Sequence, residues 1–332
     1  MNEECPKMDQ TMQDRNQFKL TIVGPGAMGC LLAATLYKQD CHVSILDYKP
    51  DRAERLKKAG IQVTSSKEAW TAFPDITAEP GSLSSQDWVI VFVKAAQTAD
   101  AVKRIGPLIG PGTLVVSLQN GIGHESTLSK TVKPEQIAIG VTSQGATLLN
   151  EGHVRHAGSG PTTLGLVIHN PEAKDRLISL VTLLNNSGWP SQIVEDIYPH
   201  IWRKLIVNVG INALTALCGI TNGTLPQHPE SQRLQQLAVA EAWTLSLKND
   251  IALGLSLEEA HDMVDSVCKA TAENMSSMLQ DRIKNRTTEI DYINGAIAGM
   301  GKELGVATPV NEVLTLLVRL NSRLGWKNPK KH

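Results

Sequence analysis

A lysine and two asparagines form the most informative pattern in this chain. Lys204, Asn208 and Asn212 follow one another at intervals of four residues within the apolar segment 201–218, IWRKLIVNVGINALTALC. This spacing places them on one face of an α-helix, and the apolar residues around them indicate that the helix is buried. A buried ammonium group and two buried amides need polar partners. Either other side chains or a bound ligand must therefore face this line.

A glycine-rich turn near the start of the chain is the second chemical signal. The turn consists of Gly24, Pro25, Gly26, Ala27, Met28 and Gly29. Its G-x-G-x-x-G spacing, between an expected strand at 19–23 and an expected helix ending near residue 39, is typical of dinucleotide-binding folds. The helix N-terminus would offer N–H groups to the phosphates. The alternative is a glycine turn that serves packing alone.

The residue at the end of the next expected strand bears on the choice of cofactor. Asp47 lies 18 residues after Gly29, where an acid binds the adenosine ribose 2′-hydroxyl and favours NAD. Lys49 and Arg52 follow closely and could instead hold a 2′-phosphate, or could be ordinary surface charges. The residues alone leave the choice between NAD and NADP open.

Polar residues also follow two later strands. Lys94 and Gln97 come after a strand ending at Val93, and Asn120 comes after a strand ending at Leu118. Ligands of open α/β sheets bind outside the carboxyl ends of the strands, so these residues are expected near the cofactor and the reacting centre. The alternative is an ordinary turn role, because Asn-Gly is itself a strong turn signal.

The second half of the chain holds further polar candidates. Asn222 follows the apolar helix and is either a turn residue or a ligand contact. Ser277 belongs to a Ser-Ser pair that suits either a cap or a ligand site. Thr288 and Asp291 have the spacing of a capping box, which would place Glu289 in the first turn of a new helix.

The pattern of apolar runs predicts the fold. Strands are expected at 19–23, 42–46, 88–93, 113–118 and 137–141, with helices near 51–59, 96–108 and 171–186. This alternation of continuous apolar strands and helices indicates a doubly wound, mostly parallel α/β sheet of Rossmann type. The segment 154–168, with glycines and a proline between two extended runs, is expected to form a hairpin. The domains expected are a flexible leader at 1–17, a dinucleotide-binding domain at 18–194 and an all-helical domain at 195–332.

Composition narrows the class of protein. The chain has 332 residues and a net charge of −1, from 32 basic and 33 acidic residues, which gives no broad attraction to nucleic acid or to an anionic membrane. The five cysteines have neither a metal-site nor a disulfide spacing. We therefore expect no metal, no membrane span and a cytoplasmic location.

Taken together, these motifs resemble the ketopantoate reductase family (2-dehydropantoate 2-reductase). The resemblance runs from about residue 18 to 320. In the first half of the chain the matching motifs are the turn 24–29, Val93-Lys94 with Gln97, and residues 119–121. In the second half they are Trp202-Arg-Lys204 with Asn208 and Asn212, Asn222-Gly223, SSMLQD at 276–281 and TEIDYING at 288–295. The helix with Lys204 and the two C-terminal motifs are much more specific than the glycine turn.

The resemblance implies an NADPH-dependent reduction of 2-dehydropantoate to (R)-pantoate, a step toward pantothenate and coenzyme A, in a cleft between the domains. It implies Lys204 as the general acid with Glu289 as its partner. The substrate-binding asparagines would be Asn208, Asn212 and Asn222, with Asn120 near the reacting centre. Ser277 would bind the substrate carboxylate. Asp47 departs from the basic residue that many members carry at this place, so NADH also stays possible.

Three alternatives stay open on the sequence. The substrate could be another branched 2-keto acid or a β-keto acid rather than ketopantoate. A nucleotide-binding sensor without turnover is a different class, against which the lysine, glutamate, asparagine and serine set argues. Nothing in the sequence distinguishes a monomer from a homodimer.

Overall fold

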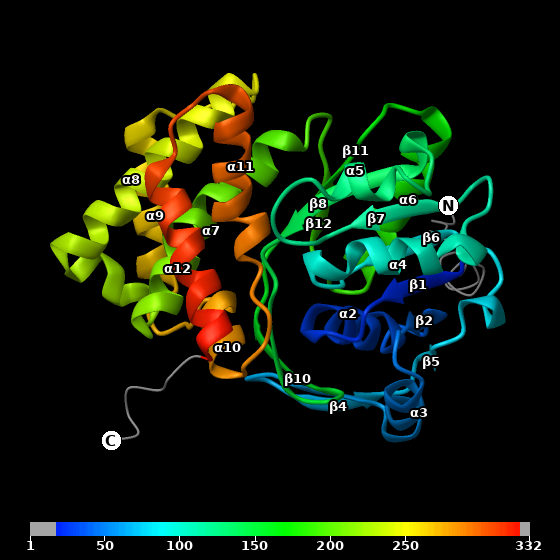
Figure 1. Ribbon diagram of the computed structural model, residues 1–332. Helices are drawn as coiled ribbons and strands as arrows, with labels where there is room; N and C mark the ends of the chain where they lie inside the picture. The colour runs from blue at the N-terminus through cyan, green and yellow to red at the C-terminus, as the bar shows by residue number, and fades with distance from the viewer. Residues whose placement is uncertain (1–17, 326–332) are drawn as a thin grey trace, which may run out of the picture. The chain divides into compact units, whose positions relative to one another are not determined.

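The computed structural model describes residues 18–325, so the expected leader at 1–17 lies outside the described residues. The chain divides into two compact units. The first contains the residues up to Gln119 and His124–Ile197, and the second contains Asn120–Gly123 together with the residues from Tyr198 onward. The short segment Asn120–Gly123 therefore groups with the helical part of the chain. Each unit is described by itself (Figure 1).

The first unit is built on an eight-stranded sheet in the order β12-β11-β8-β7-β6-β1-β2-β5. Neighbouring strands are parallel except for β11 and β8. The strands are β1 (Leu20–Val23), β2 (Val43–Leu46), β5 (Asp75–Thr77), β6 (Trp88–Val91), β7 (Leu114–Ser117), β8 (Ile137–Thr142), β11 (Thr162–Leu166) and β12 (Ser191–Ile193). Strands β1, β6 and β7 are buried at every residue, which explains their unbroken apolar sequences.

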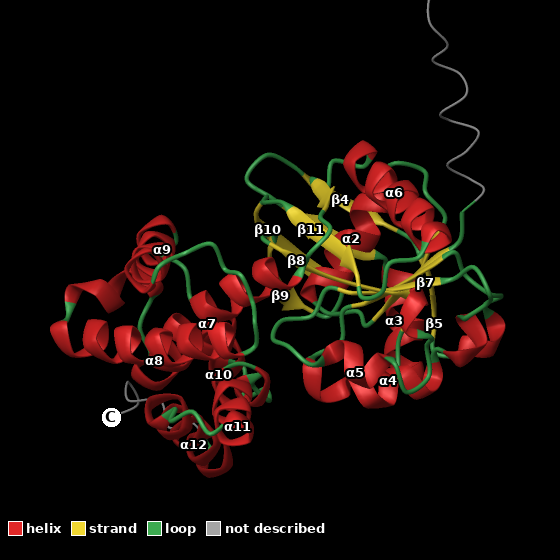
Figure 2. Cartoon of the chain, turned by 90° about the horizontal axis from the view of Figure 1, so that it is seen from above, coloured by secondary structure: helices red, strands yellow, loops and turns green. Residues whose placement is uncertain are grey.

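Helices cover both faces of this sheet. Helices α2 (Ala27–Tyr37) and α6 (Pro171–Asn186) lie on one face, and α4 (Thr98–Arg104) and α5 (His124–Leu128) lie on the other (Figure 2). Alternate strand residues such as Leu20 and Ile22 pack under α2 and α6 in the main apolar core, as the pleat of a strand requires. Helix α3 (Pro50–Ala59) packs near β5. The predicted mostly parallel α/β sheet is confirmed.

A second sheet of four strands is the main departure from expectation. Its order is β4-β3-β10-β9, with β3 at Ile61–Thr64, β4 at Ala69–Ala72, β9 at Gly145–Asn150 and β10 at His153–Gly158. The expected hairpin at 154–168 is wrong. Strand β10 pairs with β9 and β3, whereas β11 pairs with β8 and β12 in the large sheet. The glycines and proline between β10 and β11 mark a crossing from one sheet to the other.

The second unit is helical throughout its described residues after Ile197. Its helices are α7 (Tyr198–Cys218), α8 (Pro229–Lys248), α9 (Leu257–Ala270), α10 (Ser277–Ile283), α11 (Asn294–Leu304) and α12 (Pro309–Leu324), with 3₁₀ turns η6 (Asn222–Gln227) and η7 (Ile290–Tyr292). Helix α7 contacts α8, α9, α10 and α12 and is the centre of this unit. The predicted helical second part is confirmed.

Helix α7 is also the one described helix that is long and apolar enough to cross a membrane. It has 21 residues, more than the sequence suggested, but 67% of its most apolar window is buried inside the protein. A helix that is apolar nearly all round is expected at the centre of a helical core. Its composition therefore follows from its place among four other helices.

Candidate active site

The glycine turn has the geometry of a phosphate-binding loop. Gly24 has a φ of +106°, which side chains rarely adopt. A Cβ on Gly29 would collide with the carbonyl oxygen of Gly24, whereas a Cβ on Gly26 would meet nothing within 4 Å. Thus Gly24 and Gly29 serve the turn and the close packing of α2. The open space at Gly26, beside the N-terminus of α2, is where a pyrophosphate would fit.

A cavity of about 130 Å³ continues from this turn along the carboxyl ends of β1, β2 and β6. It is lined by Val23, Gly24, Leu46, Asp47, Tyr48, Val93, Gln97, Asp100, Ala101 and Arg104. Two predicted cofactor residues, Asp47 and Gln97, therefore line one cavity. Its walls are largely apolar, as the adenosine part of a dinucleotide requires.

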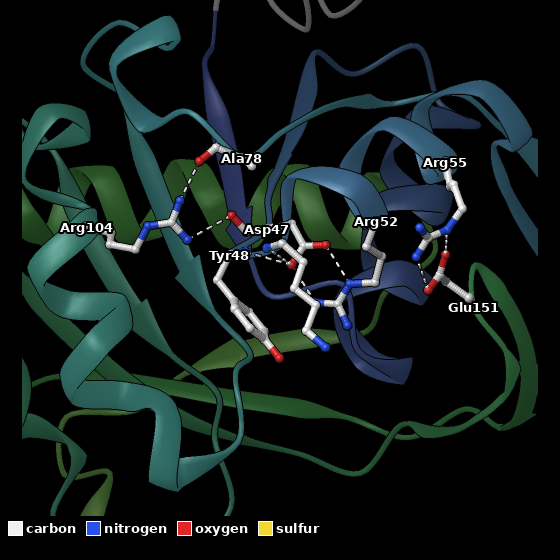
Figure 3. A network of polar contacts seen from close by, with 8 residues as sticks. Asp47, Tyr48, Arg52, Arg55, Ala78, Arg104 and Glu151 are labelled. Carbon is white, nitrogen blue, oxygen red and sulfur yellow. Dashed lines mark hydrogen bonds and ion pairs between the residues drawn. The ribbon is translucent and has the colours of Figure 1, made fainter.

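Asp47 is buried, and its carboxylate is already bonded on both oxygens. Arg52 donates to Oδ2 from Nε at 2.6 Å and to Oδ1 from Nη2, and the backbone N–H of Tyr48 donates to Oδ1 at 2.6 Å (Figure 3). The Asp47 side chain is 0% exposed. In this arrangement the Asp47 carboxylate links the end of β2 to Arg52 in α3. It does not present a free carboxylate to the cavity.

Cationic side chains surround the exposed ring of Tyr48 beside this buried acid. The Lys49 ammonium lies 5.4 Å and the Arg52 guanidinium 5.2 Å from the ring centroid. The hydrogen bond to Asp47 raises the pKa of Arg52, so the guanidinium stays charged. Arg104 approaches the same region from α4 and donates to the carbonyl oxygens of Asp47 and Ala78 (Figure 3). The sequence analysis missed Arg104, because 57 residues separate it from Asp47 and no local motif marks it.

The two residues that follow β6 have different surroundings. Lys94 is half-buried and Gln97 is exposed at the start of α4. Behind them, Gln119 donates to the carbonyl oxygen of Val93 at 2.8 Å and to the hydroxyl of Thr98 at 2.7 Å. This amide joins the end of β6 to α4. It fixes the backbone that carries Lys94 and Gln97.

In the second unit, α7 carries Lys204, Asn208 and Asn212 on one face. Lys204 and Asn208 are half-buried and Asn212 is buried. Burial lowers the pKa of Lys204 from 10.5 to about 8, while the charge of Glu289 opposes this change. A lysine whose pKa lies near neutrality can donate a proton and accept it again at working pH. The line that the sequence predicted is thus present, with a tuned ammonium at its N-terminal end.

Asn120 and Glu289 meet within the second unit. The Asn120 amide donates to Oε2 of Glu289 at 3.3 Å. Gly121 makes this approach possible, because its φ is +89° and a Cβ there would collide with the carbonyl oxygen of Tyr292. The Asn-Gly pair is therefore both a turn and a contact with the motif that carries Glu289. Lys204, Glu289 and Asn120 form one electrostatic cluster.

Asn222 presents a buried acceptor. Its Nδ2 donates to the hydroxyl oxygen of Thr271 at 2.9 Å, and that hydroxyl donates onward to the carbonyl of Val267 at 2.7 Å. This pair of hydrogen bonds fixes the orientation of the Asn222 amide. The Thr271 hydroxyl has already donated its proton to Val267, so it can only accept a hydrogen bond from the amide nitrogen. Oδ1 of Asn222 is buried and has no partner among the described residues. A buried carbonyl oxygen of this kind needs a donor, which a ligand hydroxyl would supply.

The C-terminal motifs differ in detail from expectation. Ser276, not Ser277, caps α10: its hydroxyl accepts from the N–H of Leu279 and is bonded by Thr215. Ser277 is the exposed first residue of that helix. The expected capping box of Thr288 and Asp291 is wrong.

Two features of this segment replace the capping box. Glu289 precedes the 3₁₀ turn η7, which has no side-chain cap. Asp291 instead pairs with Arg319 of α12 at 2.6 Å. Glu289 therefore has no capping duty, and its charge is directed to the cluster with Lys204 and Asn120.

Comparisons with known proteins support this description over both units. Residues 20–168 match the model of ketopantoate reductase PanE/ApbA, and residues 196–322 match that of its C-terminal domain. Among curated proteins, the 2-dehydropantoate 2-reductase of Halobacterium salinarum is 30% identical over 93% of this chain and 100% of its own length. That of Archaeoglobus fulgidus is 33% identical over 91% of this chain and 97% of its own length.

Solved structures of related proteins have the same fold. A D-mandelate dehydrogenase with NADH and anilino(oxo)acetate is 31% identical, with a TM-score of 0.87 over 92% of this chain and 99% of that one. The 2-dehydropantoate 2-reductase of Geobacter metallireducens GS-15 is 26% identical, with a TM-score of 0.84 over 91% of this chain and 99% of that one. With both family models matched across most of its length, the chain belongs to the ketopantoate reductase family.

Proposed function

We propose that this protein is a cytoplasmic 2-dehydropantoate 2-reductase that uses NADPH. The observation that carries the proposal is Lys204, a half-buried lysine with a pKa of about 8 beside Glu289 and in line with Asn208 and Asn212. A nucleotide-binding sensor has no need of a proton donor tuned in this way. The four described cysteines are free, which suits a reducing compartment.

Each residue has a part in the proposed reaction. A bound dinucleotide supplies the hydride. Lys204 stabilises the negative charge that develops on the ketone oxygen and delivers a proton there. Glu289 orients the ammonium, and Asn120 holds Glu289 in place through its hydrogen bond at 3.3 Å. Asn208 and Asn212 hold the substrate by directed hydrogen bonds, and Ser277, exposed at the start of α10, binds its carboxylate.

Asn222 supports ketopantoate as the substrate. Its fixed and buried Oδ1 needs a hydrogen-bond donor, and the terminal hydroxyl of 2-dehydropantoate is such a donor. A site built around a substrate hydroxyl rejects analogues that lack it, because the buried acceptor is then left unpaired. We therefore expect 2-keto acids without this hydroxyl to be poorer substrates.

NADPH is supported by the side chains at the end of β2. Asp47 is buried and bonded by Arg52, so it has little remaining capacity for a ribose hydroxyl. The charges that face outward beside it belong to Lys49 and Arg52, around Tyr48. A 2′-phosphate matches an ammonium and a guanidinium, whereas a 2′-hydroxyl gains much less from them. In this site, a buried acid does not select NAD.

Steady-state reduction of 2-dehydropantoate with NADPH and with NADH tests both parts of the proposal. If neither NADPH nor NADH supported turnover, the proposed activity would be refuted. If kcat/KM were higher with NADH than with NADPH, the proposed choice of cofactor would be refuted. Lys49→Gln should weaken binding of NADP⁺ by about tenfold, the scale of one lost charged contact of about 1.4 kcal/mol. Arg55→Gln is the matched control, because Arg55 lies on α3, which begins directly after Lys49, but pairs with Glu151 on the surface (Figure 3).

A second candidate is the reduction of another 2-keto acid. The 31% identity to D-mandelate dehydrogenase lies between the 30% and 33% identity to the two curated ketopantoate reductases compared above. A panel of 2-keto acids with branched, aromatic and hydroxylated side chains separates the two. If phenylglyoxylate were reduced with a higher kcat/KM than 2-dehydropantoate, the second candidate would replace the first.

A further inference from the structure

The turn that follows α9 is bonded to the start of η6, where Asn222 lies. Helix α9 has Thr271 as its C-cap residue. The backbone N–H of Asn222 donates to the carbonyl oxygen of Asn274 at 3.0 Å, and that of Gly223 donates to the carbonyl oxygen of Ala272 at 3.1 Å. A Cβ on Gly223 would collide with Ala272, so glycine permits the two segments to approach. The main chain of Asn222 is therefore fixed relative to the end of α9.

The hydroxyl of Thr271 determines which end of the Asn222 amide turns toward α9. It donates its one proton to the carbonyl oxygen of Val267, one turn earlier in α9, at 2.7 Å. Oγ1 can then only accept, and Nδ2 of Asn222 donates to it at 2.9 Å. If the amide were turned over, its oxygen would face the hydroxyl oxygen with no proton between them. The amide nitrogen is therefore held on the side of α9.

The other end of the amide is the part that is left for a ligand. Asn222 is 7% exposed, and its Oδ1 is buried and has no partner in the part of the chain that the structure describes. A hydroxyl group can donate to this oxygen, whereas a methyl group or an ether oxygen would leave it unpaired. Through the amide, the Thr271 hydroxyl thus sets whether this position accepts or donates a hydrogen bond.

We propose that Thr271 is a positioning residue that selects keto acids with a terminal hydroxyl. It does so by holding the Asn222 amide with its oxygen toward the substrate. The inference rests on the proposed function, because it takes a keto acid as the ligand. It adds a residue that acts through Asn222 alone, since its hydroxyl is used on both sides, by the Val267 carbonyl and by the Asn222 amide.

Two keto acids that differ by one oxygen atom test the proposal. 2-Dehydropantoate ends in a hydroxymethyl group, and 3,3-dimethyl-2-oxobutanoate has a methyl group in its place. Calorimetric dissociation constants, measured in the presence of NADP⁺, give the preference for the hydroxyl without any turnover. The wild type should bind 2-dehydropantoate at least about tenfold more tightly, the scale of one buried acceptor left unpaired.

Two variants of Thr271 separate its hydroxyl from its methyl group. Thr271→Val keeps the shape and removes the hydroxyl, so the preference should fall by about fivefold or more, because the amide is no longer held. Thr271→Ser keeps the hydroxyl, and its preference should stay within about twofold of the wild type. A role in packing alone predicts the reverse order. Thr244→Val is the matched control: Thr244 of α8 donates to the carbonyl oxygen of Ala240 at 2.8 Å in the same way, and its variant should keep the wild-type preference.

An Asn222→Ala background tests whether Thr271 acts through the amide. Thr271→Val should change the preference no further there, because the group that it positions is gone. A further loss in this background would overturn the proposal, as would a wild-type preference in Thr271→Val or a larger loss in Thr271→Ser than in Thr271→Val.

Failure of the inference and failure of the proposed function give different results. If the preferences follow the expected order but NADPH supports no reduction of 2-dehydropantoate, the proposed function fails and the positioning role stands. If 2-dehydropantoate is reduced and Thr271→Val keeps the wild-type preference, the inference alone fails. Binding of neither keto acid to the wild type would overturn both.

Discussion

The state of the Lys204 ammonium should control the pH dependence of reduction. Burial lowers its pKa from 10.5 to about 8, and Glu289 partly opposes this change. In the proposed mechanism the protonated form of Lys204 is the acid, so the rate of reduction should be highest below pH 8 and should fall as the pH rises through it. Glu289→Gln removes the opposing charge. The pKa of Lys204 should then fall further, and the decline should begin at lower pH.

The size of the effect follows from the pKa. With a pKa of about 8, the lysine is about 90% protonated at pH 7 and about 10% protonated at pH 9. The value of kcat/KM for reduction should therefore fall about tenfold between these two pH values. A lysine that kept its ordinary pKa of 10.5 would show almost no decline over this interval.

Glu289→Gln is a conservative change at this position. The glutamine oxygen can still accept the hydrogen bond that Asn120 donates at 3.3 Å, so the shape of the cluster is retained. Asp291→Asn is the matched control. Asp291 lies two residues away, but its carboxylate is half exposed and pairs with Arg319, so its removal should leave the midpoint near 8.

Initial rates measured from pH 6 to pH 10, at several concentrations of keto acid and saturating cofactor, give the midpoint for each variant. Oxidation of the hydroxy acid should show the opposite trend and rise with pH, because the neutral lysine then accepts the proton. A wild-type profile without decline up to pH 9.5 would contradict the reasoning. So would a midpoint that moves upward in Glu289→Gln, or one that moves equally in Asp291→Asn.

Three further outcomes follow from the structure. Gly29→Ala should lower the melting temperature, because the added Cβ collides with the carbonyl oxygen of Gly24. Gly26→Ala should have the melting temperature of the wild type, because its Cβ meets no atom within 4 Å. It should bind the cofactor at least tenfold more weakly, as a titration followed by nucleotide fluorescence would show. Lys204→Met should abolish turnover. Below pH 8 it should also stabilise the fold by up to about 3 kcal/mol, because the charged lysine is costly to bury in the folded protein there. Urea unfolding measured at several pH values should show this gain in stability disappear toward pH 10.5. Asn222→Ala should raise KM for 2-dehydropantoate by about tenfold or more while leaving KM for a 2-keto acid without a hydroxyl almost unchanged.

The parts of the fold that sequence patterns predicted are those governed by local periodicity. The continuous apolar strands β1, β6 and β7 are fully buried. An unbroken apolar run of this kind predicts a strand that is covered on both faces without any knowledge of its neighbours. The four-stranded sheet escaped prediction for the opposite reason. Its strand β10 pairs with β3, which is distant in sequence, and no short segment records such a partner.

The candidate site shows the same division. The line of Lys204, Asn208 and Asn212 could be predicted because helical spacing alone defines it. The free acceptor of Asn222 could not, because it depends on Thr271, 49 residues away, having used its own proton. The capping box failed similarly: Asp291 is bonded by Arg319 of α12, and a long-range ion pair took precedence over a local motif.

Asp47 shows why a local rule can name the right residue and still leave its role undecided. The rule that an acid at the end of the second strand favours NAD assumes a carboxylate that faces the ribose. Here Arg52, in the first turn of the next helix, donates to both carboxylate oxygens, and the acid is buried. The same pair leaves Arg52 charged beside Lys49 and Tyr48. Asp47 is therefore occupied by an arginine of its own unit, and the acid in the sequence does not by itself decide between the two cofactors.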